Sequence, residues 1–184
     1  MPQALDSARG SIGRFLHEAT KCAEIECGFS AMLSAFSVIL GISEAVYHDN
    51  RIVPLIMWFF SKMNDKTSWL ILPTAASHDQ NEIGKKLADL RNGLAHEFSM
   101  PSDVLLAKNI QSATEKKDRY PDKYIINIKE FLDAVRKTAG EIVDSNPQAV
   151  LDANPRGVNR ATAILLGDET ESVPLSGSSG RGSH

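Results

Sequence analysis

Apolar residues recur at helical spacing through most of the chain, most densely over residues 29–46. Two stripes run along this segment at intervals of three and four residues, and together they cover most of its circumference. One stripe contains Phe29, Leu33, Phe36 and Leu40, and the other contains Met32, Ala35, Ile39, Ile42 and Val46. A helix that is apolar on so many sides is buried between neighbours. We therefore expect this segment, which starts after a break at Gly28 and ends at His48, to be the central helix of a bundle.

Three further segments have the apolar periodicity of amphipathic helices. They are residues 6–25, capped by Asp6 or Ser7; residues 79–96, capped by Asp79 or Asn81; and residues 128–143. In the second of them Ile83, Leu87, Leu90 and Leu94 form one apolar stripe, and Pro101 follows soon after its end near His96. The chain is therefore expected to be mainly helical.

Two short apolar runs, Ile52–Phe60 and Trp69–Pro73, are denser than an amphipathic helix requires. Pro54 suits the first turn of a helix in the first run, and the second run is either extended or the end of a helix. Both are expected to lie in the core, although their aromatic side chains are also typical of a dimer surface.

After residue 103, short β-forming and irregular segments accompany the remaining helix. Val104–Ala107 and Tyr124–Ile128 are rich in β-forming residues, and the charged segment between them predicts a small β-hairpin near residues 104–128. Beyond Asn146, short apolar pieces alternate with Pro, Gly and Asn, which predicts an extended tail. The expected fold class is all-α: a bundle of four to five helices with a small hairpin and an extended C-terminal tail.

We expect the helical domain to occupy residues 1–145 and a C-terminal extension to occupy residues 146–175. Residues 176–180 have the composition of a flexible linker, and Arg181-Gly182-Ser183-His184 resembles the beginning of a polyhistidine tag. Residues 176–184 are therefore left out of the functional argument.

Composition narrows the classes of function. The chain has 184 residues, 42% hydrophobic and 23% charged, and its formal net charge of −3 argues against a protein that coats nucleic acid non-specifically. Two cysteines, Cys22 and Cys27, exclude a disulfide-rich scaffold, and we expect them to be buried thiols in a reducing cytosol. A membrane span requires roughly 20 consecutive apolar residues, and polar residues interrupt each of the most apolar stretches, 29–46 and 53–72. We expect a soluble, cytoplasmic protein that does not bind membranes.

One segment carries recognisable chemistry. Leu90-Arg91-Asn92-Gly93-Leu94-Ala95-His96 places a permanent cation, an amide and an imidazole at the end of an amphipathic helix. It resembles the R-x4-H signature of the HEPN superfamily of all-α domains, in which a polar residue follows the Arg and a His comes near the helix C-terminus. Arg91, Asn92 and His96 match each element, and the pattern of helices extends the resemblance over about residues 5–144.

The resemblance implies a metal-independent endoribonuclease acting as a toxin or defence effector, with Arg91, Asn92 and His96 catalytic and no cofactor. The 2′-OH of RNA would attack the adjacent phosphate and leave 2′,3′-cyclic phosphate and 5′-OH ends. An imidazole exchanges protons near neutral pH and a guanidinium binds phosphoryl oxygens, so both residue types suit this reaction. The resemblance also implies RNA as substrate, a homodimer that pairs the motif helices, and a protein antitoxin or regulatory partner.

Two alternatives stay open at this point. The same fold also serves as a non-catalytic module that binds nucleotide, RNA or protein. Alternatively, the chain is an unrelated bundle in which Arg91 and His96 only complement the negative end of a helix dipole.

The spacing of Arg91 and His96 sets a geometric condition. Residues five apart in an α-helix are separated by about 500°, or roughly 140° around the axis. One straight helix therefore cannot direct both side chains at one phosphate. Either the helix ends or bends between Gly93 and His96, or a second protomer completes the site.

Basic residues near the motif are weaker candidates for RNA contacts. Residues 108–137 carry a net charge of +3, which fits either an RNA-facing patch or a solvated surface. The candidates are Lys85, Lys86, Lys116, Lys117 and Arg119. Phe98 stands where one branch of the family has a Tyr that is nucleotidylated, so neutralisation by modification at that position is excluded.

Overall fold

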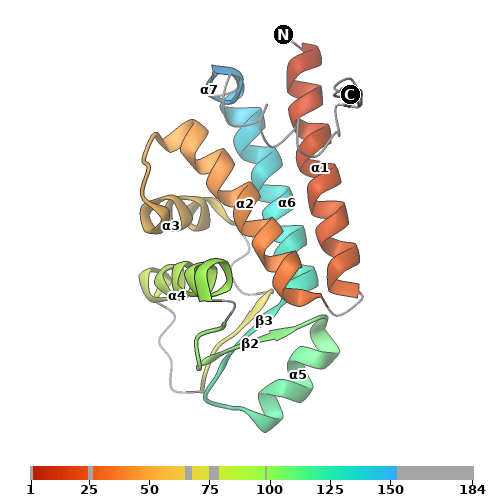
Figure 1. Ribbon diagram of the computed structural model, residues 1–184, viewed down its shortest axis with the longest axis vertical. Helices are drawn as coiled ribbons and strands as arrows, with labels where there is room; N and C mark the ends of the chain where they lie inside the picture. Colours follow the sequence, from red (N-terminus) through yellow and green to blue (C-terminus); the bar gives the residue numbers. More distant parts are fainter. Residues whose placement is uncertain (1, 25–26, 65–67, 75–78, 98, 153–184) are drawn as a thin grey trace, which may run out of the picture.

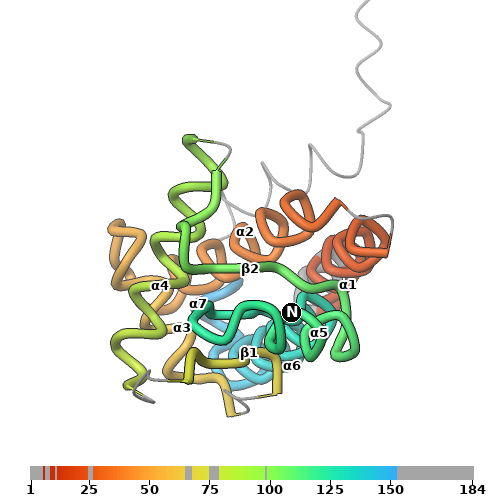
Figure 2. The backbone as a smooth tube through the Cα atoms, turned by 90° about the horizontal axis from the view of Figure 1, so that it is seen from below, coloured from red at the N-terminus to blue at the C-terminus, as the bar shows by residue number. Residues whose placement is uncertain are grey.

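The long helices of the bundle run side by side. The computed structural model describes residues 2–24, 27–64, 68–74, 79–97 and 99–152. α1 (Pro2–Glu24), α2 (Gly28–Tyr47) and α6 (Ile128–Ser145) follow the long axis, whereas α3 (Ile52–Lys62) and α4 (Gln80–Asn92) run across it (Figure 1). Viewed along the long axis, α1 and α4 lie on opposite sides of the molecule with α2 between them (Figure 2). The mainly helical fold class is confirmed.

α2 is the central helix, as its apolar stripes predicted. It packs against α1, α3 and α6. The ring of Phe36 lies 6.1 Å from that of Phe131 on α6, which in turn lies 4.9 Å from the ring of Trp69. The helix begins at Gly28, and His48 closes it in the left-handed conformation (φ 58°) by donating its backbone N–H to a carbonyl one turn earlier.

The two dense apolar runs lie in the core. Ile52–Phe60 forms most of α3, with Pro54 in its first turn and four buried side chains: Leu55, Ile56, Phe59 and Phe60. Trp69 is fully buried beside the short strand β1 (Leu70–Ile71). The interpretation of these runs as core is confirmed.

A small sheet of three strands replaces the predicted hairpin. β2 (Val104–Ala107) and β3 (Tyr124–Asn127) are the two predicted strands, but they pair in parallel, with Val104 opposite Tyr124. α5 (Ile110–Arg119) connects them, and β1 pairs antiparallel with the other edge of β3. The predicted hairpin is therefore wrong in topology, because α5 occupies the segment between the two strands, where the hairpin would have had its turn.

Both ends of the described chain differ from expectation. α1 begins at Pro2, so Asp6 and Ser7 lie inside the helix and do not cap it. Residues 147–152 form the short helix α7 (Pro147–Asp152) where an extended tail was expected, and its Val150 is buried against the bundle. The remainder of that tail and the linker-like residues 176–184 lie outside the described residues.

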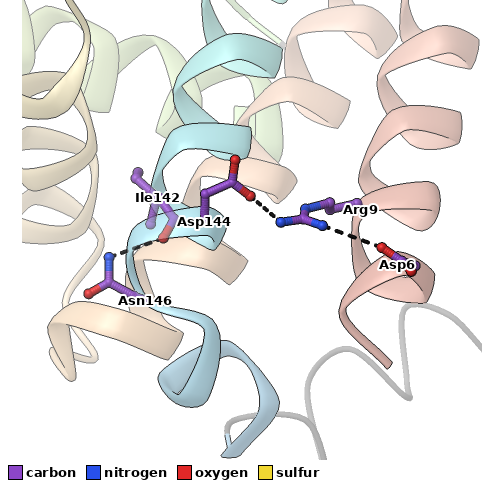
Figure 3. A network of polar contacts seen from close by, with 5 residues as sticks. All are labelled: Asp6, Arg9, Ile142, Asp144 and Asn146. Carbon is purple, nitrogen blue, oxygen red and sulfur yellow. Dashed lines mark hydrogen bonds and ion pairs between the residues drawn. The ribbon is translucent and has the colours of Figure 1, made fainter. Parts of the chain in front are cut away.

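Arg9 joins α1 to the end of α6. Its guanidinium bonds the carboxylate of Asp144 on α6 and, at 3.3 Å, that of Asp6 on its own helix (Figure 3). The hydrogen bond that Arg9 donates to Asp144, followed by the charge of that carboxylate, raises the pKa of Arg9. Beside this contact, Nδ2 of Asn146 donates to the carbonyl of Ile142 at 3.0 Å, and the backbone N–H of Asn146 donates to the same carbonyl at 2.9 Å, so this residue closes the end of α6.

The cysteines are not both buried. Cys22 is half-buried, Cys27 is exposed, and both are free thiols. The expectation was wrong for Cys27, which lies just before α2 with its side chain exposed. Its backbone N–H donates to the carbonyl of Cys22 at 2.8 Å, and its carbonyl accepts the N–H of Ala31 at 3.1 Å.

Among the described helices, α2 is the one long and apolar enough to cross a membrane by length and composition. Half of its apolar window is buried inside the bundle, where α1, α3 and α6 surround it. A core helix of a soluble protein has these same properties, so the fold is consistent with a soluble protein.

Candidate functional site

α4 carries the motif. Asp79 caps this helix by accepting a hydrogen bond from the backbone N–H of Asn81 at 2.9 Å, which decides between the two predicted caps. The apolar stripe of α4 is buried, and Gly84 lets the helix approach Met57 of α3 closely. Arg91 stands in the last turn, just beyond this packed face.

Two polar contacts fix α4 to the sheet. The hydroxyl of Tyr124 on β3 donates to Oε1 of Glu82 at 2.6 Å, and Nζ of Lys86 lies 2.6 Å from Oδ2 of Asp103. Burial, together with the bond to Glu82, raises the pKa of Tyr124 to about 12. The hydrogen bond to Asp103 raises the pKa of Lys86. These two contacts therefore hold α4, whose last turn contains Arg91, against the sheet and the segment that precedes it.

The helix changes form where the motif continues. After Asn92 the chain forms η1, a single turn of π-helix over Gly93–Glu97. A π-helix bonds residues five apart, where an α-helix bonds residues four apart. This widening is the local change that the five-residue spacing required, and a second protomer is not needed to bring Arg91 to His96.

Three predicted site residues meet at one guanidinium nitrogen. Nη1 of Arg91 lies 3.2 Å from Nε2 of His96 and donates to Oδ1 of Asn92 at 3.1 Å. Arg91 and Asn92 are half-buried, whereas His96 is exposed. The group is therefore anchored on one side and open to solvent on the other.

The contact defines which atoms are available for chemistry. A guanidinium has five N–H donors and accepts no hydrogen bond, so Nε2 of His96 must be the acceptor in this pair. The imidazole is then neutral, with its proton on Nδ1. Nη1 is engaged by both neighbours, and within the described part of the chain the Nε and Nη2 groups of Arg91 have no hydrogen-bond partner.

No carboxylate among the described residues pairs with Arg91. In the described residues the guanidinium forms no ion pair with a carboxylate, although the adjacent turn contains Glu97. The carboxylate of Glu97 instead accepts a hydrogen bond from the hydroxyl of Ser99 at 3.1 Å. A half-buried cation without an acidic partner is suited to bind an anion.

The candidate RNA-binding cations fall into two groups. Lys86 is paired with Asp103, and Nζ of Lys117 lies 2.7 Å and 2.8 Å from the carbonyl oxygens of Leu72 and Pro121. These two therefore have intramolecular roles. The side chains of the other three form no hydrogen bond or ion pair in the part of the chain that the structure describes. They are exposed Lys85 on α4, and half-buried Lys116 and exposed Arg119 on α5.

Gly93 and Ser99, which shape the turn, were not predicted as part of the site. Gly93 and Ser99 approach each other so closely that a Cβ added at Gly93 would lie 2.8 Å from the carbonyl oxygen of Ser99. The glycine inside the motif was the available signal. Phe98 lies outside the described residues.

Among the residues that are described, no group of three His, Cys, Asp or Glu side chains is arranged to hold a metal ion.

No family model, no curated protein and no solved structure matches this chain significantly. The likeness to the HEPN superfamily therefore rests on residues 90–96 and the helical pattern, and the function that it implies is argued below from the site.

Proposed function

We propose that the protein is a metal-independent endoribonuclease of the HEPN type. The observation that supports this most directly is the pairing of Arg91 and His96, whose Nη1 and Nε2 atoms lie 3.2 Å apart on an accessible surface. In this proposal RNA is cleaved by its own 2′-OH, and the products carry 2′,3′-cyclic phosphate and 5′-OH ends.

His96 acts as the proton-transfer group. When a ligand draws Arg91 away, the lone pair on Nε2 becomes free to accept the proton of the 2′-OH. The 2′-oxygen then forms a bond to phosphorus and the bond from phosphorus to the 5′-oxygen breaks. The leaving oxygen takes a proton from water, and the proton that His96 has accepted is released to the resulting hydroxide. DNA lacks the 2′-OH, so it binds without being cut by this route.

Arg91 binds the phosphate that gains charge in the transition state. Its Nε and Nη2 groups form the planar fork that fits two phosphoryl oxygens. Asn92 holds the opposite edge of the guanidinium through Nη1 and so sets the direction of the fork. A donor group that is held on one edge in this way needs only a small movement to stabilise the developing charge.

The partners follow from the same proposal. The substrate is RNA, whose backbone extends from the site toward Lys85, Lys116 and Arg119. Two copies of the chain pair so that two sets of Arg91 and His96 line one cleft, and light scattering at micromolar concentration tests this, with a monomer counting against it. The biological role is that of a cytoplasmic toxin or defence effector restrained by a protein antitoxin or another regulatory partner.

Cleavage of RNA in excess EDTA tests the activity. Structured and unstructured RNAs are incubated with the wild type, Arg91→Ala and His96→Ala, and the ends of any products are identified. Matched controls are Arg14→Ala and His17→Ala, two exposed residues of the same types on α1.

The proposal predicts cleavage that survives chelation, is lost in both site variants and persists in both controls. Binding without cleavage would identify the protein as a non-catalytic module. Intact RNA without binding would leave only a structural bundle. Growth arrest on expression, relieved by His96→Ala, separately tests the role as a toxin.

A further inference from the structure

The turn that unites Arg91 and His96 is closed by a backbone contact at its base. The N–H of Ser99 donates to the carbonyl of Gly93 at 3.2 Å and so closes the base of the turn Gly93–Glu97. His96 lies in this closed loop, and Leu94 within it is buried with 1% of its surface exposed. Two anchors, the base of the loop and the side chain of Leu94, thus determine where the imidazole lies.

The loop closes only because residue 93 has no side chain. Gly93 has ordinary right-handed helical angles (φ −58°, ψ −48°), so its conformation does not itself demand glycine. What demands it is space: a Cβ there would lie 2.8 Å from the carbonyl oxygen and 3.6 Å from the carbonyl carbon of Ser99. These are backbone atoms, which cannot rotate away as the end of a flexible side chain does.

We propose that Gly93 is the positioning residue of the site, because it allows the exit segment at Ser99 to close the widened turn that brings His96 to Arg91. With a larger residue at position 93, Ser99 must move off or the turn must rewind. A rewound α-helical turn would place the side chains of Arg91 and His96 roughly 140° apart around the axis. This inference concerns the site used in the proposed function, but the arrangement that it explains exists whether or not RNA is cleaved.

The test reads the protonation pattern of His96 directly. In the wild type, the bond from Arg91 leaves the imidazole proton on Nδ1, and nitrogen NMR distinguishes this tautomer from the one protonated on Nε2. Arg91→Ala removes the bond and gives the reference spectrum of an unpaired His96. We expect Gly93→Ala to shift the His96 signals to the positions seen in Arg91→Ala, and the double variant to show no further shift.

Gly41→Ala and Gly140→Ala are matched controls, because a Cβ at either helical glycine meets nothing within 4 Å. Both are expected to keep the wild-type His96 signals. A Gly93→Ala protein that is folded and keeps the wild-type tautomer would overturn the inference.

A second measurement needs no variant and decides the case in which Gly93→Ala does not fold. Hydrogen exchange at the Ser99 amide of the wild type should be slowed by its bond to Gly93, relative to an exposed amide. Exchange as fast as that of an exposed amide would overturn the inference. Absence of RNA cleavage by the wild type would refute the proposed function and leave both measurements valid.

Discussion

Replacing Arg91 with Lys separates the charge of this residue from its shape. Nη1 of Arg91 already contacts Asn92 at 3.1 Å and His96 at 3.2 Å, and the opposite edge is left for a ligand. An ammonium has three donors that radiate from one atom, and it has no planar fork. Lys at this position therefore cannot hold both neighbours and also bind two phosphoryl oxygens.

The expected loss can be estimated from these contacts. A hydrogen bond to a charged group contributes about 1.5–3 kcal/mol, and about 1.4 kcal/mol corresponds to a tenfold change in rate. The loss of one such bond to the transition state predicts that kcat/KM falls by about 10- to 150-fold in Arg91→Lys. Removal of the whole donor group in Arg91→Ala is expected to cost about 100- to 1,000-fold in kcat.

The assay measures cleavage of a short RNA in EDTA under single-turnover conditions, together with RNA binding at several salt concentrations. Because Lys keeps the charge, the dependence of binding on salt should be unchanged in Arg91→Lys and shallower in Arg91→Ala. Arg14→Lys on α1 serves as the control. Wild-type kcat/KM in Arg91→Lys would refute the assignment of the Nε–Nη2 edge to the phosphate.

Three further predictions concern polar contacts elsewhere in the fold. Nζ of Lys117 binds two carbonyl oxygens at 2.7 and 2.8 Å, so Lys117→Met should lower the free energy of unfolding in urea by about 1–2 kcal/mol; an unchanged midpoint would contradict this structural role. Because the folded pKa of Tyr124 is raised from 10.0 to about 12, this residue contributes stability below pH 10 that is lost as the pH rises toward 12. Denaturation at pH 9 and pH 11 should therefore show a smaller decline for Tyr124→Phe than for the wild type. Hydrogen bonds from the side chain and backbone of Arg51 lower the pKa of Asp49 to about 2, so its stabilising effect is present above pH 3.8 and lost as the pH falls toward 2. NMR titration of Arg51→Ala should find a higher Asp49 pKa that stays below 3.8, because the backbone N–H of residue 51 still donates to the carboxylate.

Elements with a strong apolar stripe could be predicted from the sequence. α4 needed only the stripe from Ile83 to Leu94 and a cap at Asp79, and both are present in the structure. α5 had no such signal, because Ala113 is its one buried residue among those the structure describes. Without that helix, the two flanking strands looked like the arms of a hairpin, although they pair in parallel.

The contact between Arg91 and His96 could be predicted only partly from the sequence. The five-residue separation of Arg91 and His96 showed that a regular helix would fail between them. Which of the two solutions the molecule uses depends on the approach of Ser99 to Gly93, a contact between residues six positions apart whose geometry no local pattern specifies. Likewise, Lys117 looked like any other surface cation, because its carbonyl partners include Leu72, 45 positions away.

The closed loop at Gly93–Glu97 also determines how the motif tolerates changes in length. Residues four apart share one face of an ordinary α-helix. Deleting Ala95 would therefore let a regular helix bring the imidazole to the guanidinium, and such a shortened chain would no longer need a glycine at position 93. Length and glycine content in this segment are thus coupled: a chain of the present length should lose the pairing when the glycine is replaced, whereas a chain shortened by one residue should keep the pairing with or without it.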